Sequence, residues 1–89
     1  MTIIDQDTLQ DPGFTSEWTV LNGVDEMRRT ITAIAGDFLE DFDVDEIESE
    51  CWDICQECTI LAEDGSPLPG EHYLIETTKI YEVMQRNEI

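Results

Sequence analysis

Three cysteines stand close together in the middle of the chain, at Cys51, Cys55 and Cys58. Thiolates bind soft transition metals, and a structural zinc site can take three thiolates and one imidazole. His72, the single histidine, could supply that imidazole. The three cysteines also fit the apolar face of a helical pattern, where cysteine acts as a small buried hydrophobic residue. We expect this core role, and therefore neither a metal nor another cofactor.

The spacing Cys51-x3-Cys55-x2-Cys58 resembles the iron–sulfur motif of radical S-adenosylmethionine enzymes, which implies three thiolate ligands to a cluster. The resemblance covers eight residues, and those enzymes are built on a barrel far larger than this chain of 89 residues. We therefore rank a small metal protein ligated by these cysteines behind the other possible functions.

A second candidate metal site lies just before the cysteines. Asp41, Asp43 and Asp45 alternate like the first ligands of an EF-hand calcium loop. The sixth position of such a loop needs glycine but is Glu46, and the twelfth needs glutamate but is Trp52. We therefore expect an acidic connection between helices. The chain also lacks a recognisable nucleophile setting and a glycine-rich phosphate loop, so we expect no enzyme.

The strongest feature is an acidic run from Asp37 to Cys58, which holds ten of the 22 acidic residues and no lysine or arginine. The gap without bases is wider still, from Thr30 to Thr78. Such a density of like charge opposes compaction, so we expect it to serve a partner. The predicted partner-binding residues are Asp37, Glu40, Asp41, Asp43, Asp45, Glu46, Glu48, Glu50, Trp52, Asp53 and Glu57.

Four of these residues form a predicted stripe along one helix. Glu46, Glu50, Asp53 and Glu57 follow each other at three or four residues and would span roughly 16 Å at 1.5 Å per residue. Carboxylates accept the bidentate arginine bonds that phosphates accept. A net charge of −18 disfavours direct binding to nucleic acid or to anionic membranes and favours a basic protein partner.

In charge pattern and size, the chain resembles the acidic inhibitors of phages and mobile elements, the anti-restriction and anti-CRISPR proteins. That resemblance implies a non-catalytic inhibitor that mimics nucleic-acid phosphates and blocks a basic DNA- or RNA-binding surface of a bacterial defence complex. The alternatives are an acidic adaptor or regulatory protein that binds a basic protein partner, a solvated acidic face without a partner, and last the small metal protein ligated by cysteines. The N-terminus lacks a secretory apolar region, and no apolar run reaches membrane-spanning length, so we expect a cytoplasmic protein.

The elements that must position these residues follow from periodicity. Residues 1–89 are expected to form one domain with an irregular lead-in over 1–16 and a short, extended segment at 17–21 that could be an edge strand. A first helix is expected over 24–41, with Val24, Met27, Ile31, Ile34, Ala35, Phe38 and Phe42 on its apolar stripe. Gly36 interrupts that stripe.

A second helix is expected over 44–58, with Asp43 as its N-cap. Trp52 falls on neither its apolar nor its acidic face, so it packs on a third element or contacts a partner. A short, extended piece at 59–62 precedes a segment, 71–87, that fits a helix and also alternates like a strand. We expect a mainly α three-helix domain. The alternative is an α+β fold with a C-terminal β-hairpin, in which 71–87 pairs with 59–62.

Overall fold

The computed structural model describes residues 2–89 and shows an α+β fold. Its elements in chain order are β1 (Thr2–Ile4), α1 (Gln6–Leu9), α2 (Pro12–Glu17), β2 (Trp18–Leu21), α3 (Glu26–Ala35), the 3₁₀ helix η1 (Gly36–Asp41), α4 (Val44–Ile54), β3 (Gln56–Ile60), β4 (His72–Glu76) and α5 (Thr77–Arg86). The four strands form one mixed sheet in the order β1-β3-β4-β2. The prediction of a mainly α three-helix domain was therefore wrong.

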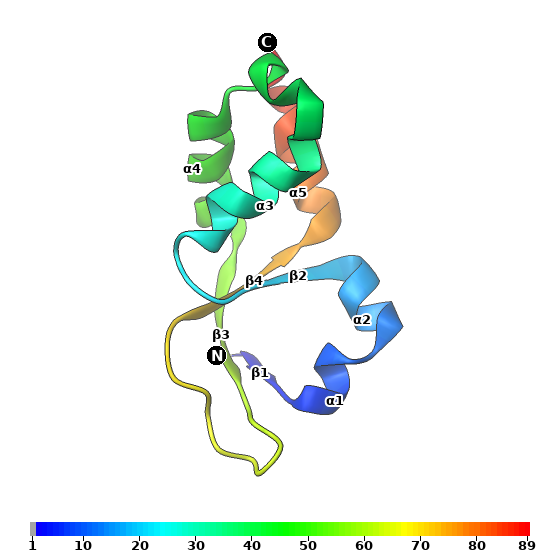
Figure 1. The fold of residues 1–89 in the computed structure, drawn as a ribbon, viewed down its shortest axis with the longest axis vertical. Coiled ribbons are helices and arrows are strands. Elements are labelled where there is room, and N and C mark those ends of the chain that lie inside the picture. Colours follow the sequence, from blue (N-terminus) through cyan, green and yellow to red (C-terminus); the bar gives the residue numbers. More distant parts are fainter. Residues whose placement is uncertain (1) are drawn as a thin grey trace.

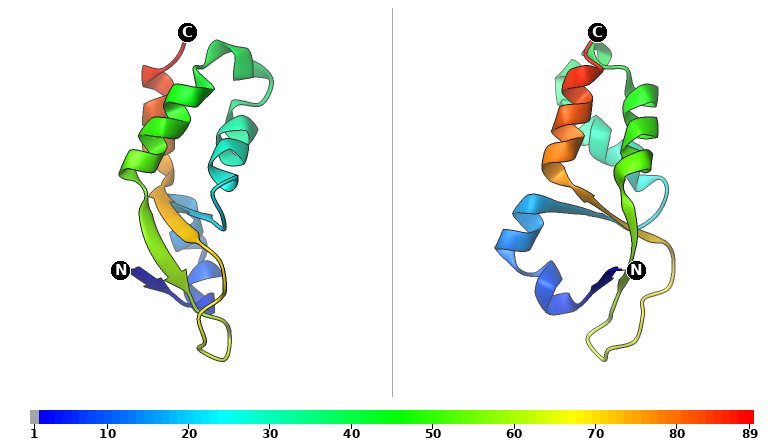
Figure 2. Two further views of the ribbon diagram at one scale, coloured as in Figure 1. Left: turned by 90° about the vertical axis from the view of Figure 1, so that its left-hand side faces the viewer. Right: turned by 180° about the vertical axis from the view of Figure 1, so that it is seen from behind.

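The molecule is elongated, with extents of 46 × 24 × 20 Å. Helices α3, α4 and α5 gather with η1 at one end, and α1, α2 and the loop 61–71 lie at the other (Figure 1). Helix α4 leads into β3 and β4 leads into α5, so the α4–α5 pair continues directly into the β3–β4 hairpin (Figure 2). Among residues 2–89, no helix is long and apolar enough to cross a membrane.

Two hydrophobic clusters share strand β4. Ile75 packs into the larger cluster, whose other members come from the helical end: Met27, Ile31, Ala35, Ile47, Cys51, Ile80, Val83 and Met84, with Leu21 of β2. Leu74 points to the opposite face and packs with Ile4, Cys58 and Ile60. Neighbouring residues of a strand face opposite sides, so β4 joins both clusters.

The irregular lead-in predicted for 1–16 was wrong for the residues that the structure describes. Strand β1 runs parallel to β3, and aspartates cap both short helices that follow. Asp5 Oδ1 accepts from the Thr8 amide at 2.8 Å, and Asp11 Oδ1 accepts from the Gly13 amide at 2.9 Å. Met1 lies outside the described residues. The predicted extended segment is confirmed as β2, an edge strand of the sheet.

The helix predicted over 24–41 ends early. Helix α3 stops at Ala35, because Gly36 takes φ 55° and ψ −126°. That conformation matches the first central residue of a type II′ turn, a position dominated by glycine. The chain continues as η1, which carries Phe38 out of the predicted apolar stripe and leaves it 68% exposed.

The second predicted helix also ends early. Asp43 is confirmed as its N-cap, with Oδ1 accepting from the Glu46 amide at 3.3 Å. Helix α4 stops at Ile54, and Cys55 is extended. The predicted helical residues 56–58 belong to β3 instead and pair antiparallel with β4 at 72–74. The ambiguous segment 71–87 divides into a strand and a helix.

Candidate partner-binding surface

The acidic run is spread over three elements at the surface. Asp37, Glu40 and Asp41 lie on η1, Asp43 caps α4, and Glu57 lies on β3; α4 carries Asp45, Glu46, Glu48, Glu50, Trp52 and Asp53. All ten acidic side chains are exposed or half-buried. The residues predicted to contact a partner therefore reach solvent, but they do not share a single helix face.

The predicted four-residue stripe was wrong. Glu57 lies beyond the end of α4, in β3, opposite Tyr73 in the antiparallel register. Glu50 faces α5 and accepts hydrogen bonds from Arg86 Nη2, at 3.1 Å, and from Asn87 Nδ2. Of the four, only Glu46 and Asp53 are exposed on α4 itself.

The acidic run has no bases within its own sequence, but two arginines reach it in space. Arg28 of α3 contacts Asp45 and also lies 3.0 Å from Glu48 through its Nε. The hydrogen bond to Asp45 is the main cause of the raised pKa of the Arg28 guanidinium. With Arg86 on Glu50, these pairs neutralise the two flanks of α4. The flanks are thus less available to a partner than the sequence suggested.

Six carboxylates of the run keep their charge unpaired. Among residues 2–89, the side chains of Asp37, Glu40, Asp41, Glu46, Asp53 and Glu57 take part in none of the hydrogen bonds or ion pairs found. All six are exposed. We call these six residues, which lie on η1, α4 and β3, the open acidic band. This band is the part of the predicted site that remains free to bind a cationic partner.

Trp52 packs within the protein. Its ring lies 4.8 Å from the ring of Tyr73, at an interplanar angle of 85°. Edge-to-face pairs of this kind add roughly 0.5–1.5 kcal/mol beyond the burial of area. Trp52 is half-buried and therefore helps to fix α4 against β4.

The candidate metal ligands do not come together. Cys51 lies in the larger hydrophobic cluster and Cys58 in the smaller one, while the Cys55 thiol donates to the Trp52 carbonyl at 3.4 Å. Buried His72 has Nδ1 3.0 Å from Asn22 Oδ1 and Nε2 3.2 Å from the Pro69 carbonyl oxygen. No group of three metal-ligating side chains occurs within residues 2–89.

Burial gives the central thiol a specific pH dependence. Desolvation raises the pKa of Cys51 from 9.0 to about 11. The unfolded chain therefore releases this proton at a lower pH than the folded one, so stability is full below about pH 9 and falls as pH rises toward 11. We expect the urea midpoint of the parent to fall more over pH 9–11 than that of Cys51→Ala. The variant should be less stable, but its stability should depend less on pH. Parallel curves would contradict this assignment.

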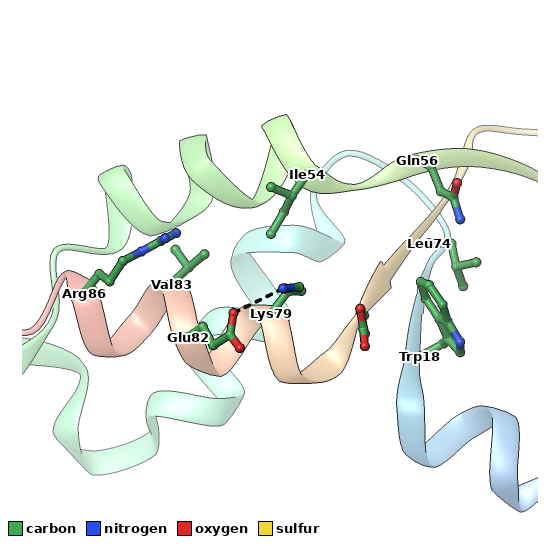
Figure 3. Close-up of a pocket in the computed structure, with 9 residues that line it drawn as sticks. Trp18, Ile54, Gln56, Leu74, Lys79, Glu82, Val83 and Arg86 are labelled. Carbon is green, nitrogen blue, oxygen red and sulfur yellow. Dashed lines mark hydrogen bonds and ion pairs between the residues drawn. The ribbon is translucent and has the colours of Figure 1, made fainter.

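Two of the cavities in the molecule were not predicted from the sequence, because their residues come from distant segments. The first, of about 360 Å³, lies between the sheet and α5 and is lined by Trp18, Leu74, Lys79, Glu82 and Arg86 among others. Figure 3 shows the sheet residues at one end and the charged residues along α5. Lys79 Nζ lies 3.5 Å from Glu82, and Arg86 is held by Glu50. Both cations in this cavity thus have partners.

The second cavity is an apolar cleft of about 320 Å³ between α3, η1 and α5. Its lining residues are Ile34, Ala35, Phe38, Phe42, Tyr81, Met84, Gln85 and Glu88. The one signal in the sequence was the glycine at position 36, which interrupts the apolar stripe before Phe38. The cleft adjoins the open acidic band, because η1 contributes to both.

Comparison of the chain with protein-family models, curated proteins and solved structures finds no match. Function is therefore inferred below from the residues of this surface and their geometry.

Proposed function

We propose that this protein is a non-catalytic inhibitor that presents carboxylates in place of nucleic-acid phosphates. Its target is the basic DNA- or RNA-binding surface of a protein or complex, of the kind found in bacterial defence systems. The observation that carries the proposal is the open acidic band, whose six exposed carboxylates have no partner within residues 2–89. A net charge of −18 extends the same field over the whole molecule.

The local structure around the six carboxylates supports this role. Helix α4 and the flanking η1 and β3 hold the carboxylates on ordered backbone. A rigid arrangement reduces the ordering cost that binding must overcome.

Charge also sets how such an inhibitor reaches its target. Opposite potentials steer the two partners together and raise the association rate, and this effect weakens as salt screens the field. Arginines of a nucleic-acid-binding surface can bind carboxylates in the bidentate geometry that they use for phosphates. The inhibitor and the nucleic acid would therefore compete for the same residues.

An acidic adaptor that docks on a basic protein outside its nucleic-acid site is the second candidate. The observation that favours it is the apolar cleft, with Phe38 68% and Tyr81 48% exposed at its edge. Large exposed aromatic side chains are typical of protein–protein contacts. Both candidates bind a basic protein, and they differ in whether nucleic acid is displaced.

Displacement of nucleic acid tests the proposal. The tagged protein is used to capture proteins from nuclease-treated bacterial lysate at about 50 and 300 mM salt, and each captured protein is then purified. We expect the main low-salt protein to bind a labelled DNA or RNA oligonucleotide and to release it, in proportion, when this protein is added. Simultaneous binding of oligonucleotide and protein would favour the adaptor, and capture unaffected by salt would contradict mimicry.

A further inference from the structure

The apolar cleft is unusual because it is open on a very acidic protein. It lies between α3, η1 and α5, with a volume of about 320 Å³ and mainly apolar walls. Met84 is buried in one wall, while Phe38 and Tyr81 are exposed by 68% and 48%. Its volume is near the lower end of ligand pockets, so it suits one large side chain better than an extended ligand.

The backbone is kinked beside this cleft. The segment η1 consists of two short helical pieces that meet at the kink. Within it, Phe38 departs from helical angles, at φ −97° and ψ 16°. Continuing α3 regularly would have placed Phe38 on the apolar stripe of Ile31 and Ile34. The chain instead leaves this phenylalanine in solvent.

One carboxylate lines the cleft, and two more are next to lining residues in the chain. Asp37 precedes Phe38, Asp41 precedes Phe42, and Glu88 itself lines the cleft. An antiparallel bridge between Phe42 and Glu88 fixes the two sides against each other. Within the part of the chain that the structure describes, these three carboxylates have no ion pair. These carboxylates are therefore open to cations of a partner.

We propose that the cleft binds one large apolar side chain, such as tryptophan or leucine, carried on a lysine- and arginine-rich segment of a partner protein. The apolar side chain fills the space between Phe38, Tyr81 and Met84, and flanking cations pair with the rim. This inference rests on the proposed function and names the chemistry of its partner. In this arrangement, charge raises the association rate, and the buried apolar side chain slows dissociation.

A second copy of this chain is a poorer occupant. Each copy carries a net charge of −18, and bringing two such clefts together would place like-charged rims against each other. The complementary occupant is a cationic segment, because only that segment lowers the charge of the rim while it covers Phe38.

Three synthetic peptides of about twelve residues test the inference. The first alternates lysine, arginine and small residues around one central tryptophan; the second has alanine in place of tryptophan; the third keeps tryptophan but replaces every base by glutamate. We expect the first peptide to bind at least about tenfold more tightly than the second, and the third not to bind. In amide NMR spectra, the first should shift signals of Ile34, Phe38, Phe42 and Tyr81. Shifts confined to the sheet would overturn the proposal.

Two matched variants locate the contact. Phe38→Ala removes the exposed ring, and Ile3→Ala removes a side chain that is 66% exposed on β1, at the other end of the molecule. We expect Phe38→Ala to weaken binding of the tryptophan peptide by about tenfold and Ile3→Ala to leave it unchanged, with both variants retaining the circular dichroism spectrum of the parent. Equal binding by both variants would overturn the assignment.

The outcomes separate this inference from the function on which it rests. If the tryptophan peptide bound at the cleft but the protein did not displace nucleic acid, the binding site would be supported and the adaptor function would be favoured over the inhibitor. If Phe38→Ala displaced nucleic acid as well as the parent does, the inhibitor function would be supported and a role of the cleft in it would be rejected. Sedimentation that shows a dimer dissociated by Phe38→Ala would assign the cleft to a second copy and overturn the inference.

Discussion

Replacing the six carboxylates of the open acidic band by their amides is expected to weaken binding to the basic target by about a hundredfold. The substitutions are Asp37→Asn, Glu40→Gln, Asp41→Asn, Glu46→Gln, Asp53→Asn and Glu57→Gln. Exposed ion pairs contribute about 0.2–1 kcal/mol each, so six at about 0.5 kcal/mol amount to about 3 kcal/mol. That free energy corresponds to roughly two powers of ten in Kd. Titration calorimetry against the captured target would measure the loss.

The same variant should be more stable than the parent. None of the six side chains has a hydrogen-bond or ion-pair partner within residues 2–89, so their removal costs the fold no contact of that kind and relieves repulsion. We therefore expect a higher urea midpoint at low salt, and a smaller gain at high salt where repulsion is already screened. A variant that lost both binding and fold would not separate the two effects, so the urea curve must accompany the calorimetry.

A second set of six amides controls for net charge. Asp7, Glu17, Asp25, Glu63, Glu71 and Glu76 are also exposed and lie outside the band. Their replacement changes the net charge by the same amount. We expect this control to lose much less affinity than the band variant. Equal losses in the two sets would show that the overall charge matters and that the band is not the contact.

Local signals in the sequence predicted part of this structure. Asp43 was recognisable as a helix N-cap from its side chain and position, and β2 from its β-branched and aromatic residues. Strand β3 was missed because Cys58 suits both patterns: it continues the helical spacing of Cys51 and Cys55, and it also alternates with its neighbours along a strand. Pairing with β1 and β4 decides the outcome. Such pairing joins residues far apart in the chain and has no local signature.

The candidate site shows the same limit. Exposure of the acidic run followed from its charge, because ionised side chains are rarely buried without partners. The sequence did not indicate which of those carboxylates are neutralised, because the arginines are distant in the chain. Arg28 precedes Asp45 by 17 residues and Arg86 follows Glu50 by 36. The division of the run into a neutralised flank and an open band depends on how α3 and α5 pack beside α4.

Replacing Gly36 by alanine is expected to lower the free energy of unfolding by about 1–3 kcal/mol. An alanine Cβ at this position meets no atom within 4 Å, so the cost comes from the backbone. A φ of 55° with ψ of −126° is unfavourable for an L-residue with a side chain. For a protein whose total stability is about 5–15 kcal/mol, this single methyl group is a large perturbation. Urea unfolding would measure it.

The alanine variant has one way to relieve the strain, which is to continue α3 through residues 36–38. That change would rotate Phe38 toward the apolar stripe and remove it from the rim of the cleft, so we also expect weaker binding of the tryptophan peptide. A chemically synthesised chain with D-alanine at position 36 is the matched control. A D-residue favours the mirror image of the L-allowed angles, so it accepts this φ and ψ and should retain both stability and peptide binding. If the L- and D-alanine chains behaved alike, the left-handed turn at Gly36 would not be what places Phe38 in solvent.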